Sequence, residues 1–238
     1  MKIVVQEAAE RGAANYGWLN ARYYFSFSNY HNPAKVHFGA LRVLNDDIIA
    51  GGGGFPPHPH DNMEIVTIPL TGSIAHKDNT GGKGLIKAGD VQIMSAGTGV
   101  EHSEFNGSET EASNLFQLWV FPKKRNIVPR YDQRTFDISD RINKWQIVVS
   151  PNEKDNALWI NQDAVFALTK LEAGKSLSYE NTFKGNGVYL VVINGSVKIN
   201  DIVLGKRDAA GISETDAFSI TASADAELLA VEVPMNLP

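Results

Sequence analysis

The sequence predicts an all-β protein made of two copies of one β unit, and three observations support this. Short apolar segments rich in β-branched and aromatic residues recur along most of the chain. Turn-forming residues separate these segments every several residues, which is typical of β-sandwiches and barrels. Sequence motifs of the first half also return in the second half. Helical signal is sparse, since only residues 134–141 favour a turn or two of helix.

The first half contains a series of segments that we expect to form strands. Thr71 and Gly72 supply one turn within the series, and residues 79–84 (NTGGKG) supply another. In the second half, the longest apolar run of the chain, residues 188–193, has the length of a buried strand. The expected strands of the first half cover residues 36–44, 64–70, 73–78, 91–94 and 115–121.

An internal repeat divides the chain. Three pairs of segments match: residues 70–74 (LTGSI) with 193–197 (INGSV), 87–91 (KAGDV) with the looser 210–212 (AGI), and 119–122 (WVFP) with 231–234 (VEVP). Charged and turn-forming residues cluster between Pro129 and Asn143. We therefore expect one domain over residues 1–132 and a second over residues 133–238.

The composition excludes several classes of protein. With 43% apolar residues among 238, the chain can bury a real core, and its net charge of −5 gives no basic footprint for nucleic acid. It has no cysteine, which excludes disulfides, iron–sulfur clusters and thiol catalysis. The N-terminus lacks the basic start and long apolar core of a signal peptide, and the longest apolar run is too short to span a bilayer. We expect a cytoplasmic protein without membrane contact or direct nucleic-acid contact.

Two short segments place metal-binding side chains two residues apart. His58 and His60 form one pair, and His102 and Glu104 form the other. Because side chains of a strand alternate between its faces, both members of each pair project to the same side. If the two strands meet, three imidazoles and one carboxylate converge, which suits a first-row transition metal such as iron, nickel, cobalt, manganese or zinc. No histidine follows His102, so we expect the second domain to lack metal ligands.

The other histidines have simpler explanations. His76 has only Asp78 as a partner at ligand spacing, and we expect a hydrogen-bonded structural role for it. His31 and His37 belong to loop and strand starts, and we assign them no role. A purely structural metal is less favoured than an open one, because structural sites usually saturate the coordination of the metal, often with thiolates.

Several separated motifs resemble, in their order along the chain, the pirin family of bicupins within the cupin superfamily. Gly52, His58, His60 and Glu64 match the first cupin motif, and residues 89–106 match the second. The resemblance covers residues 15–122 and implies two stacked β-barrel (jelly-roll) domains with few short helices, a bicupin fold. The matching segments are 17–19 (GWL), 24–27 (YFSF), 41–46 (LRVLND), 57–60 (PHPH), 64–67 (EIVT), 76–78 (HKD), 89–97 (GDVQIMSAG) and 102–104 (HSE).

The resemblance also implies the composition of the site. Fe(II) is the expected metal, with nickel, manganese, cobalt, copper or zinc as alternatives. Glu64 occupies a position that many other cupins use as a ligand, and here we expect it around the ligands or in the pocket wall. Asp61 and residues 98–101 depart from the family pattern and change the charge at the pocket rim. The implied metal ligands are His58, His60, His102 and Glu104.

Pirin-like proteins are associated with dioxygenation of the flavonol quercetin, which loses carbon monoxide. The resemblance therefore implies a metal-dependent dioxygenase that takes O₂ and a flavonol-like aromatic enol, with Glu104 as the catalytic base. The alternative is a metal- or redox-sensing protein that binds a transcription factor or metabolic enzyme without turnover. The acidic balance of the chain makes a protein, rather than DNA, the expected partner in that case.

Overall fold

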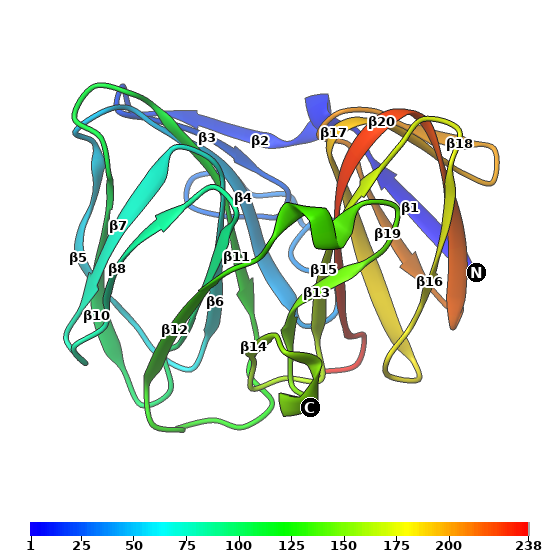
Figure 1. Ribbon diagram of the computed structural model, residues 1–238. Coiled ribbons are helices and arrows are strands. Elements are labelled where there is room, and N and C mark those ends of the chain that lie inside the picture. Colours follow the sequence, from blue (N-terminus) through cyan, green and yellow to red (C-terminus); the bar gives the residue numbers. More distant parts are fainter. Residues whose placement is uncertain (238) are drawn as a thin grey trace.

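The computed structural model describes residues 1–237, which form two layered β-sheet halves that lie side by side (Figure 1). Within these residues, helix is limited to three 3₁₀ turns, η1 (Ala8–Glu10), η2 (Ile138–Arg141) and η3 (Glu153–Asp155), and no helix could cross a membrane. The strands of the first half are β2 (Gly12–Asn15), β3 (Leu19–Tyr23), β4 (Leu41–Ile49), β5 (Gly54–His60), β6 (Glu64–Thr71), β7 (Ser73–Asp78), β8 (Lys83–Lys87), β9 (Asp90–Ser95), β10 (Val100–Asn106), β11 (Ser113–Val120) and β12 (Arg130–Thr135). The strands of the second half are β1 (Lys2–Gln6), β13 (Gln146–Ser150), β14 (Leu158–Trp159), β15 (Val165–Leu171), β16 (Ser176–Glu180), β17 (Asn186–Ile199), β18 (Ile202–Leu204), β19 (Ala209–Ser213) and β20 (Ala217–Pro234).

The two halves share one strand order. The larger sheet of the first half runs β12-β9-β6-β11-β4-β3-β2, and that of the second half runs β1-β19-β17-β20-β15-β13-β14. The first half adds a smaller sheet, β5-β10-β7-β8. In the second half, the long strands β17 and β20 continue into an equivalent layer, where they pair with β18 and β16. This correspondence confirms the all-β bicupin fold and the repeat expected from the sequence.

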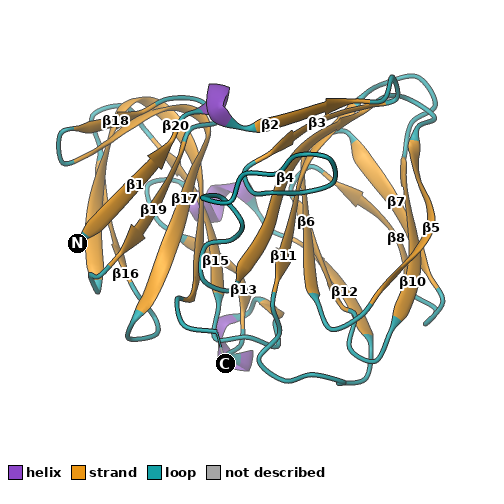
Figure 2. Cartoon of the chain, turned by 180° about the vertical axis from the view of Figure 1, so that it is seen from behind, coloured by secondary structure: helices purple, strands orange, loops and turns teal. Residues whose placement is uncertain are grey.

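One strand crosses between the halves. β1 comes before the first barrel in the chain, yet it pairs antiparallel with β19 in the second sheet, from Lys2 opposite Ser213 to Gln6 opposite Ala209. There it takes the place that β12 holds beside β9 in the first sheet. Figure 2 shows β1 among the strands of the second half. Residues 2–6 thus belong to the larger sheet of the second half. The domain boundary between residues 132 and 133 stays a prediction.

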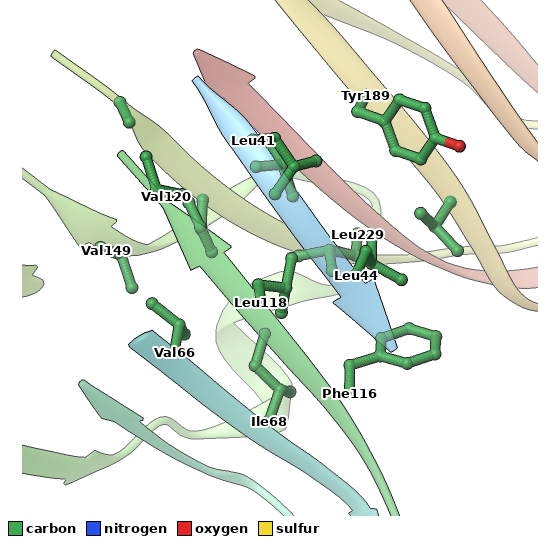
Figure 3. Packing of buried hydrophobic residues seen from close by; sticks show 14 of the residues in the cluster. Leu41, Leu44, Val66, Ile68, Phe116, Leu118, Val120, Val149, Tyr189 and Leu229 are labelled. Atoms are coloured by element: carbon green, nitrogen blue, oxygen red, sulfur yellow. The ribbon is translucent and has the colours of Figure 1, made fainter. Parts of the chain in front are cut away.

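The two larger sheets pack against each other, and their facing side chains form the main core. Alternate residues of β6 and β11 supply it from the first half, because the side chains of a strand alternate between its faces. Burial of this apolar surface is the dominant stabilising contribution to the fold. The core includes Val66, Ile68, Phe116, Leu118 and Val120 from the first half, and Val149, Tyr189 and Leu229 from the second (Figure 3).

A buried ionic network also joins the halves. Asp46 of β4 pairs through Oδ2 with Arg11 Nη1 at 2.8 Å and with Arg207 Nε at 3.2 Å. Asn114 Nδ2 donates to Asp46 Oδ1 at 2.8 Å, and Arg207 Nη2 donates to Asn114 Oδ1 at 2.8 Å. Because breaking a buried ion pair costs about 3–5 kcal/mol, this network holds β4 against the second half.

Two local expectations need correction. Residues 36–40 are not a strand, and β4 instead runs from Leu41 to Ile49. Gly39 has a φ of 51°, and a Cβ on it would lie 2.2 Å from the carbonyl oxygen of Pro234, so the chain turns there instead of extending. The helical expectation for residues 134–141 holds only at η2, because residues 134 and 135 end β12.

Replacing Leu118 with alanine should test the core between the halves. Leu118 is fully buried, so Leu118→Ala should lower the free energy of unfolding by about 2–5 kcal/mol in chemical denaturation. Val128→Ala is the control, because Val128 is 83% exposed and its loss should cost less than about 0.5 kcal/mol. Equal stabilities for the two variants would contradict this account of the core.

Candidate metal centre

β5 and β10 are antiparallel neighbours, so the two pairs of candidate ligands lie on adjacent strands. β5 is the edge strand of the smaller sheet, where its three prolines interrupt no interior ladder. His102 lies opposite His58, and a bulge separates His102 from Glu104 in the pairing with β5. Buried and more exposed residues alternate along β10, and this alternation turns His102 and Glu104 to the buried face.

The structure brings the three histidines together. The ring centroids are 4.4 Å apart for His58 and His102, 5.0 Å for His58 and His60, and 5.0 Å for His60 and His102. One ring nitrogen of each lies within 4.8 Å of the others. Glu104 forms a second such group with His102 and His76. His102 belongs to both groups, so the Glu104 carboxylate lies next to the cluster of three histidines on the side of His102.

The surroundings of His60 and His102 favour the neutral imidazole, which is the form that binds metals. Burial, together with neighbouring His102 and His58, lowers the pKa of His60 to about 4. Burial, together with His58 and His76, lowers the pKa of His102 to about 3. His58 Nδ1 lies 2.9 Å from the carbonyl oxygen of Pro56 and donates to it, which leaves the lone pair of His58 on Nε2.

One buried imidazole nitrogen of the site, His102 Nε2, has no hydrogen-bond partner among residues 1–237. A buried polar atom left unpaired costs about 1–3 kcal/mol, and coordination of a metal removes this cost. The donor set of neutral imidazoles with a carboxylate and no thiolate fits iron, nickel or another divalent transition metal.

Glu104 is held from two sides. Thr67 Oγ1 donates to its Oε1 at 3.3 Å, and Gln117 Nε2 donates to its Oε2 at 2.6 Å. Trp119 Nε1 in turn donates to Gln117 Oε1 at 3.1 Å and fixes the amide orientation. Thr67 and Gln117 were not predicted from the sequence as residues of the site. The signal for both was a polar residue on the inward face of an otherwise apolar strand.

Glu64 is not part of the pocket, which corrects the expectation for this residue. Thr67 faces the site, whereas Glu64 lies on the opposite face of β6 with Val66 and Ile68. Its Oε2 accepts hydrogen bonds from Ser95 Oγ at 2.8 Å and from the backbone N–H of Asn161 at 3.1 Å. Burial raises the pKa of Glu64. The carboxyl therefore connects the first barrel to a loop of the second half.

His76 makes the hydrogen bond expected for it and one further contact. Its Nε2 lies 3.0 Å from Asp78 Oδ2, and its Nδ1 lies 3.4 Å from His102 Nδ1. Its ring stacks on Tyr131 with the centroids 4.6 Å apart. His76 is therefore in direct contact with a candidate ligand.

A cavity of about 370 Å³ adjoins His58 and His60, and its walls are rich in aromatic residues. Two of its polar residues, Asn45 and Asp47 of β4, each carry a buried oxygen without a hydrogen-bond partner in the described part of the chain. Asp61 and residues 98–101 line a separate hollow on the other side of His60 and Trp119, not this cavity. The cavity is lined by Tyr16, Trp18, Leu19, Tyr23, Phe27, Ser28, Asn45, Asp47, Phe55, His58, His60, Glu104, Gln117 and Trp119.

Both halves of the chain match known protein families. A model of the Pirin family matches residues 4–120, and a model of the quercetinase C-terminal cupin domain matches residues 147–233. The quercetin 2,3-dioxygenase of Escherichia coli K12 is 42% identical over 235 residues, which are 98% of this chain and 99% of that protein. The chain belongs to the pirin family. This confirms the family resemblance seen in the motifs.

Other pirins are similar along their whole length. A pirin-like protein of Caulobacter vibrioides is 44% identical over 222 residues, which are 93% of this chain and 95% of that protein. The crystal structure of the bacterial pirin YhhW of Escherichia coli in complex with nickel(II) gives a TM-score of 0.93 at 40% identity. It covers 99% of this chain and 100% of that one. The pirin fold is thus shared from end to end.

The stability of this pirin should depend on pH through Asp47. Burial, with the charges of Asp46 and Glu104, raises the pKa of Asp47 to about 8, from 3.8 when unfolded. A carboxyl with a raised native pKa contributes full stability below its unfolded pKa and loses it as the pH rises through the native pKa. From about pH 4 to about pH 8, the stability of Asp47→Asn relative to the wild type should therefore rise by a few kcal/mol.

Urea denaturation of the chelator-treated protein at several pH values measures this difference. Asp201→Asn is the control, since Asp201 is exposed on a turn and its substitution should leave the pH profile unchanged. A stability difference for Asp47→Asn that stays constant from pH 4 to pH 8 would show that Asp47 ionises as it does in water.

Proposed function

We propose that this pirin is a metal-dependent dioxygenase that cleaves a flavonol-like aromatic enol with O₂, an activity of the quercetin 2,3-dioxygenase type. One observation carries the proposal: three histidines converge, and two of them, His58 and His60, line an aromatic cavity with the buried Glu104, a cavity large enough for a small planar ligand. The name of the Escherichia coli relative supports the reaction class.

The proposed metal ligands are His58, His60, His102 and Glu104, and Fe(II) is the metal we expect. The nickel(II) complex of YhhW supports nickel as the first alternative, and manganese, cobalt, copper and zinc accept the same types of ligand. When bound, such an ion would supply Lewis-acid activation of an enol oxygen, and a redox-active ion such as Fe(II) would also supply redox coupling to O₂.

The protein contributes an oriented base. Gln117 and Thr67 hold the two oxygens of Glu104 before any substrate arrives, so little reorganisation is needed when a proton is transferred. We propose that Glu104 accepts the proton of the enol hydroxyl. Glu104 is only 3% exposed, so bulk water does not compete for that proton.

The cavity walls contribute orientation. Trp18 and Phe55 meet edge to face with centroids 5.0 Å apart, and Trp119 meets His60 edge to face at 4.8 Å. These rings offer apolar surface to a planar aromatic ligand. The unpaired oxygens of Asn45 and Asp47 are available to hydroxyl groups of the ligand, because each gains a hydrogen bond when the ligand enters.

Elemental analysis and O₂ consumption with quercetin test the function directly. His102→Ala removes the buried nitrogen and should weaken metal affinity by more than about 100-fold, with loss of turnover. Glu104→Gln keeps the size of the side chain but removes the base, so turnover should fall at least about 100-fold even when metal is supplied in excess. His31→Ala is the matched control, since His31 is exposed and outside the cavity.

The outcomes separate this proposal from its alternative. A metal-loaded wild type that consumes no O₂ with quercetin or related enols, but captures a protein partner only when loaded, would replace the enzyme by a metal-sensing regulator. Retention of metal in His102→Ala would contradict the proposed ligands. A cytoplasmic location and a protein partner stay predictions.

A further inference from the structure

A chain of three buried side chains runs from the proposed metal site toward the β7–β8 turn. His102 Nδ1 lies 3.4 Å from His76 Nδ1, and His76 Nε2 lies 3.0 Å from Asp78 Oδ2. All three residues are at most 9% exposed. Buried groups of this kind need a defined donor and a defined acceptor at every contact.

Asp78 begins the chain as a pure acceptor. Its Oδ1 accepts three hydrogen bonds, from Thr80 N at 2.8 Å, Thr80 Oγ1 at 2.7 Å and Gly82 N at 2.9 Å. Burial opposes ionisation, but the hydrogen bonds from His76, Thr80 and Gly82 outweigh it and lower the pKa of Asp78. An ionised carboxylate can only accept, so the contact with Asp78 requires a proton on His76 Nε2.

The remaining protons then follow in order. In its uncharged form, with the proton on Nε2, His76 has its lone pair on Nδ1, which then accepts from His102. His102 must therefore carry its proton on Nδ1, and its lone pair lies on Nε2. That nitrogen is the buried one without a hydrogen-bond partner in residues 1–237, beside His58 and His60.

We propose that His76 and Asp78 are positioning residues that fix the tautomer of His102, so that its Nε2 lone pair faces the metal. The inference rests on the proposed metal site and assigns a role to two residues outside the proposed set of ligands. Hydrogen bonds of this kind orient a ligating histidine and raise its basicity.

The surroundings hold both positioning residues in place. Tyr131 stacks on His76 with an interplanar angle of 25°, which fixes the plane of the imidazole. A Cβ on Gly82 would lie 2.2 Å from Asp78 Oδ2 and 2.9 Å from Tyr131 Cβ. The turn closes over the carboxylate only because glycine stands at this position.

Asp78→Asn tests the proposal with almost no change in shape. Asn Oδ1 can keep the bonds to Thr80 and Gly82, so its NH₂ group faces His76 Nε2 and donates to it. The proton of His76 then moves to Nδ1 and faces His102 Nδ1, which must become an acceptor. His102 would then carry its proton on Nε2, and the metal would lose a ligand.

We expect Asp78→Asn to bind Zn²⁺ and Ni²⁺ about 10–100-fold more weakly than the wild type, measured by competition with a chelator of known affinity. Long-range ¹H–¹⁵N NMR spectra of the metal-free protein should show the His102 proton on Nδ1 in the wild type and on Nε2 in the variant. Asp90→Asn is the matched control. Asp90 is a buried carboxylate of the same barrel that accepts from Lys87 N and Thr135 Oγ1, and it makes no hydrogen bond to a histidine among residues 1–237.

A second variant, His76→Phe, keeps an aromatic ring against Tyr131 and removes the acceptor. His102 should then show both tautomers, with a smaller loss of affinity, so the proposal stays testable if Asp78→Asn does not fold. A wild-type His102 with its proton on Nε2 would overturn the proposal, as would a folded Asp78→Asn with unchanged affinity. A wild type that binds neither Zn²⁺ nor Ni²⁺ would refute the proposed metal site. The tautomer of His102 in the metal-free protein would still show whether His76 and Asp78 fix it.

Discussion

The two faces of β4, β6 and β11 are the constraint on which the rest of the molecule depends. Residues of one parity, such as Val66 and Leu118, pack against the second half. Residues of the other parity, such as Thr67, Gln117 and Asn45, lie in register across the sheet and form the floor of the site. A strand that slipped by one residue would exchange the two faces, so the packing of the halves also fixes the position of Glu104.

The second half lacks histidine, but it contacts the faces of β4 and β6 that lie opposite the site. Arg207 pairs with Asp46, and the next residue along β4, Asp47, points into the cavity on the opposite face. Glu64 forms a second connection, since it accepts a hydrogen bond from the backbone of Asn161. The position that many other cupins give to a metal ligand is here used to join the two halves.

The sequence predicted the elements that depend on local patterns. Strand periodicity was sufficient to predict that His58, His60 and His102 converge. The internal repeat was sufficient to predict two similar sheets. The contacts that depend on distant residues were not predictable. The turn at Gly39 is imposed by Pro234, the orientation of Glu104 by Gln117, and the pairing of β1 by β19. A pattern within a strand shows which residues share a face, but it does not show which other strand that face will meet.

Because β1 pairs with the sheet of the second half, the two barrels depend on each other during folding as well as in the final structure. Lys2 and Ser213 are opposite each other in the sheet although most of the chain separates them. Contacts so distant in sequence form late and slow folding, because a long loop must close before they contribute. Until β1 docks, β19 is an open sheet edge on which another chain can pair. The short strand β1, only five residues long, therefore protects the sheet edge of the second barrel from pairing with other protein molecules.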